Sequence, residues 1–271
     1  MLLNRVTLAL LFANSLVPAF LLQSRDKITM DTSNIVALNN IHHKDLKIIT
    51  AYSEQHGNNV ASVLTFPTEF AQIQREYPIL FQKLPQTGEF QSIALLGIKA
   101  GENLFIRDNE WHASYIPAIV SSEPFIIGFE DQSNVGGSEH QPIIYVDMNS
   151  SRISQKEGEA VFREFGGNTS YLEKITQNLH ALYQGFSSSQ AMFALFNELA
   201  LIEPVSLEIK LNNDQMYRLQ GNYTINPDKL AALDGHSLAK LHAAGFLECA
   251  FFVSASLNNM QKLIDIKNSR I

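Results

Sequence analysis

Residues 93–129 read IALLGIKAGENLFIRDNEWHASYIPAIVSSEPFIIGF and contain the only tryptophan of the chain. Gly101-Glu102-Asn103 predicts a tight turn between two apolar runs. Apolar runs bounded by glycine, proline or charged residues predict β-strands at 93–98, 104–106, 111–119 and 125–129. Together these elements predict an antiparallel meander.

The hydrophobic pattern changes along the chain. The first half contains short apolar runs that end at proline, glycine or polar loops, which is typical of strands. After Gly167 the apolar residues recur at helical spacing, in two stripes that predict a helical pair. Alternation then predicts a β-hairpin. Beyond the quoted stretch, we expect strands at 46–50, 60–66, 79–84 and 143–146, a helix at 68–77, the helical pair at 172–186 and 192–202, and the hairpin at 205–211 with 217–219.

This order of elements predicts an α+β fold, with a mostly antiparallel sheet from the first half packed with the later helical pair and the β-hairpin. We expect residues 30–271 to form a single domain, because no repeat or low-complexity linker divides them. Residues 1–29 are expected to be an extension outside the core or a signal-like segment.

The N-terminal segment leaves the location of the protein open. An apolar run from Val6 to Leu22 is interrupted by Asn14, Ser15 and Pro18, and 17–19 satisfies the small-residue rule for signal cleavage. Met30 alternatively begins a sequence that resembles an ordinary amino terminus. We expect a cytoplasmic protein, or one exported to the periplasm or cell surface if residues 1–22 act as a signal peptide. No other stretch is apolar for long enough to span a bilayer.

Composition excludes some functions. The formal net charge is −7 and lysine and arginine are scattered, which argues against a nucleic-acid-binding surface. The single cysteine, Cys249, excludes an internal disulfide framework and a multi-cysteine zinc site. It lies among apolar residues, so we interpret it as a buried small hydrophobic residue.

His43-Lys44-Asp45 has the spacing of a metal-ligand pair. In non-haem iron oxygenases such a pair joins a distant histidine around an open metal face, and His112 and His140 are the candidate third ligands. The placement argues against this, because almost nothing that could fold precedes His43. The alternative is a surface histidine and aspartate at the start of the first strand.

Motifs of known catalytic sites are absent from the sequence. HExxH, GxSxG and GxGxxG do not occur, so helical zinc sites, nucleophile elbows and nucleotide-binding turns have no support. Catalytic residues therefore stay unassigned, and we expect no metal and no cofactor.

The aromatic residues of the quoted stretch form the candidate ligand-binding site. On a strand, Trp111, Tyr115 and Pro117 would project from one face, because side chains alternate along a strand. Such a face could bind a peptide or a protein partner, with Glu102 and Asn103 on the preceding turn as orienting polar groups. The alternative is that these aromatic residues belong to the core.

An ordered set of short segments resembles the bacterial SapC family, named after a protein associated with surface-layer gene clusters. The segments that carry the resemblance are His43-Lys44-Asp45-Leu46; Arg75-Glu76-Tyr77-Pro78-Ile79; Ala94-Leu95-Leu96-Gly97; Gly101-Glu102-Asn103-Leu104-Phe105; Trp111 with Tyr115-Ile116-Pro117; Pro124-Phe125; Glu157-Gly158-Glu159; Gly221 with Tyr223; and Ser256-Leu257-Asn258. Family members often place a polar residue before the last segment, where this chain has Val253. That difference argues against a catalytic role for this position.

The resemblance implies an accessory protein found in some genomes near outer-membrane uptake receptors and tryptophan-halogenase-like enzymes. A peptide-transporter permease shares the family name, but it would need several membrane spans, which this hydropathy excludes. Two functions stay open. One is a non-catalytic accessory or binding protein that recognises a peptide, small ligand or protein partner in a surface- or uptake-related system. The alternative is a metal-dependent enzyme of the non-haem iron type that uses His43 and Asp45.

Deleting residues 1–29 is expected to leave the melting temperature nearly unchanged, because no amphipathic stripe before Met30 could pack on a core. Thermal unfolding of the shortened chain beside the full chain measures this. A fall of several degrees would show that the segment packs on the folded protein.

Overall fold

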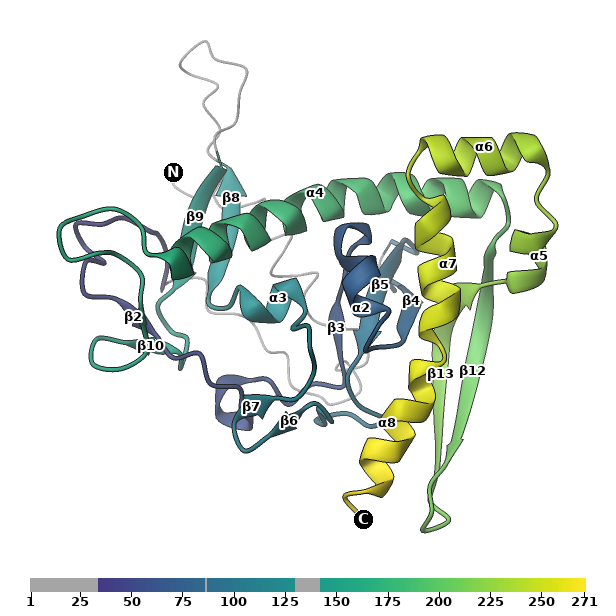
Figure 1. The fold of residues 1–271 in the computed structure, drawn as a ribbon, viewed down its shortest axis with the longest axis horizontal. Coiled ribbons are helices and arrows are strands. Elements are labelled where there is room, and N and C mark those ends of the chain that lie inside the picture. The colour runs from purple at the N-terminus through teal and green to yellow at the C-terminus, as the bar shows by residue number, and fades with distance from the viewer. Residues whose placement is uncertain (1–33, 86, 130–141) are drawn as a thin grey trace. The chain divides into compact units, whose positions relative to one another are not determined.

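The computed structural model describes residues 34–85, 87–129 and 142–271, which separate into two units (Figure 1). Of the described residues, unit 1 contains 34–58, 118–129 and 142–183, and unit 2 contains 59–85, 87–117 and 184–271. The expectation of a single domain over residues 30–271 stays a prediction. Residues 1–29 and His140 lie outside the described residues.

A five-stranded antiparallel sheet organises unit 2. Ile79, Leu80 and Phe81 of its central strand are all buried, so both faces of the sheet are covered. The ring of Phe81 packs edge-on against Phe193 with centroids 5.0 Å apart. The order of the strands is β12 (Ile202–Lys210), β13 (Met216–Ile225), β4 (Ile79–Lys83), β5 (Phe90–Leu95) and β3 (Ser62–Leu64).

Short helices complete unit 2. The predicted helix at 68–77 is present in part, since α2 covers Phe70–Ile73 after the 3-10 turn η4 at Pro67–Glu69. Figure 1 shows α7 beside β13. The helices after the hairpin are α5 (Pro227–Ala231), α6 (Gly235–Ala243), α7 (Leu247–Ser256) and α8 (Asn259–Asn268).

Unit 1 is built from two small antiparallel sheets. The first has the order β1 (Ile35–Ala37), β9 (Pro142–Asp147) and β8 (Phe125–Phe129), and the second has the order β10 (Ile153–Ser154), β2 (Lys47–Ile48) and β11 (Glu159–Ala160). The remaining elements are η3 (Glu54–His56), α3 (Ala118–Ser121) and the first part of α4 (Ser170–Glu198).

The α+β class, the antiparallel pairing and the hairpin are confirmed, whereas the helical pair is wrong. The first predicted stripe and residues 192–198 of the second lie on α4, one continuous helix of 29 residues, whereas Ile202 begins β12. The serines between the stripes do not end α4, because Ser188 and Ser189 donate to the carbonyl of Gly185, at 3.0 and 2.9 Å, and so stay within the helical hydrogen-bond pattern.

The predicted meander is also wrong. The strand expected at 111–119 stops at Trp111, because β7 (Glu110–Trp111) pairs only with β6 (Ile106–Arg107). Residues 112–117 are irregular, and Pro117 lacks the N–H that a sheet ladder requires. The strand at 125–129 exists, but it pairs with β9 of unit 1.

Among the described residues, no single helix is long and apolar enough to cross a bilayer, although the bent pair Gly235–Ala243 and Leu247–Asn268 has the required length and composition. Cys249 is buried, as predicted.

Gly101→Val is expected to lower the free energy of unfolding by about 1 kcal/mol or more, because Gly101 has a φ of +70° that a β-branched residue tolerates poorly. A Cβ there would meet no other atom, so backbone strain alone is tested. Gly235→Ala is the control: Gly235 is helical, without positive φ, and the added methyl group is expected to be neutral or stabilising. Equal stability of the two variants in denaturant unfolding would contradict the assignment of this turn.

Candidate functional site

The hydroxyl of Tyr77 joins the two aromatic residues predicted from the sequence. Trp111 Nε1 donates to Tyr77 Oη at 2.8 Å, and Tyr77 Oη donates in turn to the backbone carbonyl of Tyr115. The Tyr77 side chain is fully buried, whereas Trp111 and Tyr115 are half-buried. The indole edge and the irregular segment 112–117 are therefore held by one phenol group.

A buried carboxylate lies under the same segment. Glu69 is only 6% exposed, and it accepts hydrogen bonds from Tyr115 Oη at 2.8 Å and from Thr65 Oγ1 at 2.9 Å. Burial, and next the negative charge of Glu69, raise the pKa of Tyr115. Burial likewise raises the pKa of Tyr77. Both hydroxyl groups therefore keep their protons and act as hydrogen-bond donors.

A second carboxylate holds the segment from its exposed side. Glu76 accepts from the backbone N of Ser114 at 3.3 Å and from its hydroxyl, and it pairs with Lys262 of α8. Burial opposes the charge on Glu76, but the bonds from Lys262 and Ser114 outweigh this and hold its pKa below the ordinary value. Glu76 is therefore ionised at neutral pH.

The C-terminal helices α7 and α8 hydrogen-bond to the backbone on either side of Tyr77. Asn259 Nδ2 donates to the backbone carbonyl of Gln74 at 2.8 Å and to that of Tyr77 at 3.3 Å. The backbone N of Ile79 donates to the buried hydroxyl of Ser256 at 2.8 Å. Segments that carry the family resemblance, widely separated in sequence, thus meet around Tyr77.

The structure brings together some of the predicted ligand-binding residues. Trp111 and Tyr115 both contact Tyr77, although tertiary hydrogen bonds place them rather than the alternation of a strand. Pro117 is buried. Their assignment to ligand binding stays a prediction.

Glu102 and Asn103 already have partners within the folded chain. Glu102 accepts from the backbone N of Ile98 at 3.2 Å and pairs with Lys267 of α8, with both side chains largely buried. Asn103 Oδ1 accepts from the backbone N of Phe105 at 2.9 Å. These contacts stabilise the turn, so the orienting role predicted for Glu102 and Asn103 receives no support from their geometry.

Glu69, Tyr77 and Glu76 were not among the site residues expected from the sequence. A usable signal existed, since Glu69, Ile73 and Tyr77 recur every four residues and so share one face of a helix. A carboxylate on an otherwise apolar face indicates a buried hydrogen-bonded partner.

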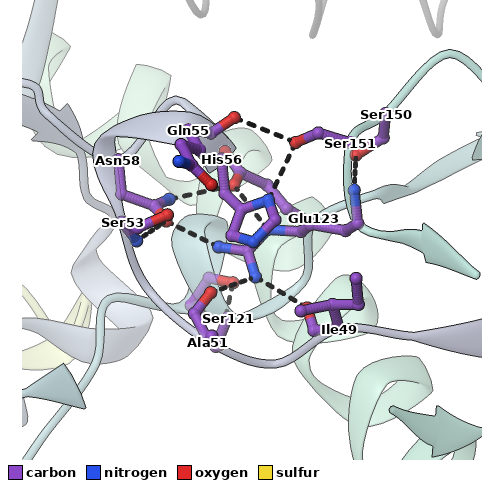
Figure 2. Close-up of polar contacts among 12 residues, drawn as sticks. Ile49, Ala51, Ser53, Gln55, His56, Asn58, Ser121, Glu123, Ser150 and Ser151 are labelled. Atoms are coloured by element: carbon purple, nitrogen blue, oxygen red, sulfur yellow. Dashed lines mark hydrogen bonds and ion pairs between the residues drawn. The ribbon is translucent and has the colours of Figure 1, made fainter. Parts of the chain in front are cut away.

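A different polar cluster organises unit 1 around Arg152, which is 3% exposed (Figure 2). Its Nη1 donates to the carbonyls of Ile49 and Ala51 at 2.9 and 2.8 Å, and its Nη2 donates to Asn58 Oδ1 at 2.7 Å. Its Nε lies 3.6 Å from Glu123 Oε2. The guanidinium group of Arg152 thus contacts residues 49–51, Asn58 and Glu123.

Glu123 has the most unusual electrostatics of this cluster. Its pKa is raised to about 7, because burial destabilises the ionised form more than Arg152 and Asn58 stabilise it. Its side chain is nevertheless 48% exposed, with Oε2 turned inward to accept from Asn58 Nδ2 at 3.3 Å. Because water reaches part of this side chain, solvent relieves some of the cost of ionisation.

His56 Nδ1 and Ser151 Oγ, both labelled in Figure 2, lie 2.9 Å apart. The hydroxyl of Ser151 donates to the carbonyl of Gln55 at 3.1 Å, so His56 Nδ1 must donate to the serine oxygen. This direction is opposite to the one that activates a serine nucleophile. Burial, and next the charge of Arg152, lower the pKa of His56, which is therefore neutral at neutral pH.

The residues of the predicted metal-ligand pattern have local partners. His43 Nδ1 contacts the backbone N and O of Asn39, at 3.1 and 3.2 Å, within one turn. His112 Nε2 lies 3.2 Å from the carbonyl of Arg107. Over residues 34–85, 87–129 and 142–271, no three His, Cys, Asp or Glu side chains are grouped to hold a metal ion.

Fold and clusters together define an α+β protein whose irregular segments are held by buried polar side chains. A family model described as SapC matches residues 38–263. The chain therefore belongs to the SapC family, which confirms the resemblance found in the sequence. No curated protein and no solved structure matches the chain.

Glu123→Gln is expected to change how stability depends on pH. Below about pH 4.5 the carboxyl group is protonated in the folded and the unfolded chain, but between 4.5 and about 7 the unfolded chain releases the proton more readily. Rising pH should therefore destabilise the wild type relative to the variant across this window, with no further change above it. Melting temperatures from pH 4 to 8 measure the effect.

Glu173→Gln is the matched control, because it removes an exposed carboxylate of the same unit that pairs with Arg163. Parallel pH profiles for the wild type and Glu123→Gln would contradict the raised pKa.

Proposed function

We propose that this SapC-family protein is a non-catalytic accessory protein that binds a peptide segment of a partner through Trp111 and Tyr115. The observation that carries the proposal is the hydrogen bond from Trp111 Nε1 to Tyr77, which fixes a half-buried indole ring before any ligand arrives. A rigid aromatic side chain binds with little loss of conformational entropy, and such residues dominate many binding sites.

The neighbouring contacts support the same role. Tyr115 is fastened through its hydroxyl to Glu69 and through its carbonyl to Tyr77, so its ring is also restrained. Ser114, between the two aromatic residues, is exposed and is held by Glu76. The segment therefore offers two positioned aromatic rings with the exposed Ser114 between them.

The metal-dependent enzyme is supported only by the spacing of His43 and Asp45. His43 contacts its own turn, and no described contact favours a ligand set that includes it. Metal analysis of the purified protein tests this alternative, since stoichiometric iron or zinc that is lost in His43→Ala would establish it.

Trp111→Ala is expected to weaken peptide binding by about 2 kcal/mol, the range found for central aromatic residues of an interface. Peptides enriched on the immobilised full chain from a random display library serve as probes, and calorimetry measures their affinity. In the wild type these peptides should change the emission of Trp111, the only tryptophan, and protect it from acrylamide.

Tyr217→Ala is the matched control, because Tyr217 is a half-buried aromatic residue on the hairpin of the same unit whose hydroxyl donates to nearby Gln215 at 3.1 Å. It should leave affinity unchanged. If no peptide is enriched, or if Trp111→Ala binds like the wild type while retaining its melting temperature, the binding proposal fails.

A further inference from the structure

Two turns of unit 1 present large apolar side chains to solvent. Ile41 is 81% exposed and Phe165 is 96% exposed, the two highest values among the exposed large apolar side chains of the described chain. Single exposed apolar residues are ordinary on protein surfaces. These two differ because each stands at the apex of a turn that other groups hold in shape.

The turn around Ile41 is built by Asn39. Its Oδ1 accepts from the backbone N of Ile41 at 3.2 Å and from that of His42 at 2.8 Å. Its carbonyl accepts from the backbone N of His43 at 3.1 Å. This arrangement of an asparagine side chain with its own following backbone fixes the turn locally.

The turn around Phe165 is a short hairpin. The backbone N of Arg163 donates to the carbonyl of Gly167 at 2.9 Å, and the backbone N of Gly166 donates to the carbonyl of Arg163 at 3.0 Å. Gly166 and Gly167 have φ values of +94° and +86°, which other residues adopt with difficulty. The backbone is thus shaped to hold Phe165 outward.

Both turns leave the same end of one strand pair. β2 and β11 are antiparallel neighbours, and the ladder continues with a bond of 3.1 Å from the backbone N of Val161 to the carbonyl of Leu46. The turn of Ile41 ends just before Leu46, and the hairpin of Phe165 begins just after Val161. The two segments therefore emerge side by side next to β2 (Figure 1).

The charges beside the two apices are balanced. Lys44 is followed by Asp45, and Arg163 is followed by Glu164. The side chains of Ile41 and Phe165, with no net charge beside them, can insert into a deformable surface that has no preformed pockets. The interfacial region of a lipid bilayer has these properties and takes up aromatic and aliphatic side chains.

We propose that this end of unit 1 docks onto the surface of a lipid bilayer, with Ile41 and Phe165 inserted among the lipid headgroups. The proposal is independent of peptide binding at Trp111, which belongs to unit 2. It assigns the two apices to one partner, a lipid surface, and makes a protein contact the competing outcome.

The experiment places a reporter at the apex of the full chain. Phe165→Cys is labelled with an environment-sensitive fluorophore at pH 7.5, where Cys249 does not compete, because burial raises the pKa of its thiol to about 11 and the thiolate is the reactive form. Phosphatidylcholine vesicles should shift the emission to shorter wavelength. The same label at Met216→Cys, an exposed apolar position of unit 2, should not shift.

Vesicle flotation tests the contribution of both side chains. The double variant Ile41→Ser with Phe165→Ser keeps every backbone hydrogen bond of the two turns, and it should lower partitioning by about tenfold or more, since two large apolar side chains lose their lipid contacts. Met216→Ser should partition like the wild type. Adding phosphatidylglycerol or salt should change partitioning little, because the neighbouring charges are balanced.

Three results would overturn the proposal: no shift of the label at position 165, unchanged partitioning of the double variant, or binding restricted to anionic vesicles at low salt. Concentration-dependent self-association that the double variant abolishes, seen without any response to vesicles, would assign the two apices to a protein contact.

Discussion

Unit 2 depends on the buried hydroxyl group of Tyr77. A phenol group taken out of water costs free energy unless its hydrogen bonds are replaced. Here the hydroxyl accepts from Trp111 and donates to the carbonyl of Tyr115, so satisfying it determines the path of the irregular segment between β7 and α3. The rest of the cluster follows, because Glu69 and Glu76 reach that segment only when it takes this path.

In unit 1 a buried charged group, the guanidinium of Arg152, supplies the hydrogen bonds that irregular backbone needs when it is taken out of water. The segments that surround Arg152 form little regular ladder, so their carbonyls need partners from side chains. The guanidinium group supplies several donors in a fixed geometry and satisfies Ile49 and Ala51 directly. Its burial is tolerated because Asn58 accepts a hydrogen bond from it and Glu123 lies beside it. Burial in the same cluster raises the pKa of Glu123, although the charge of Arg152 lowers it.

The two units therefore present different surfaces. The aromatic residues of unit 2 are held by hydrogen bonds from beneath and are partly covered, which favours recognition of a specific side chain. The apices of unit 1, Ile41 and Phe165, are shaped by their own turns and are almost fully exposed, which favours a partner without defined pockets. Both features arise where regular secondary structure ends and side-chain hydrogen bonds shape the backbone.

The sequence by itself determined the features that local chemistry controls. Apolar runs placed the central strands, alternation placed the β12–β13 hairpin, and glycine placed the turn at Gly101, because periodicity and positive φ are properties of a few neighbouring residues. The family was also readable from the order of short segments. Trp111 and Tyr115 were expected on one face of a strand, whereas hydrogen bonds to Tyr77 bring them together.

Only the tertiary structure decided where residues 111–119 leave the strand conformation, that residues 170–198 form the single helix α4, and that Glu69, Tyr77 and Arg152 organise their surroundings. The bonds of Tyr77 to Trp111 and of Arg152 to Ile49 join residues that are 34 and 103 positions apart. Such contacts leave no local pattern, because their energy depends on a buried environment that exists only after the chain has folded.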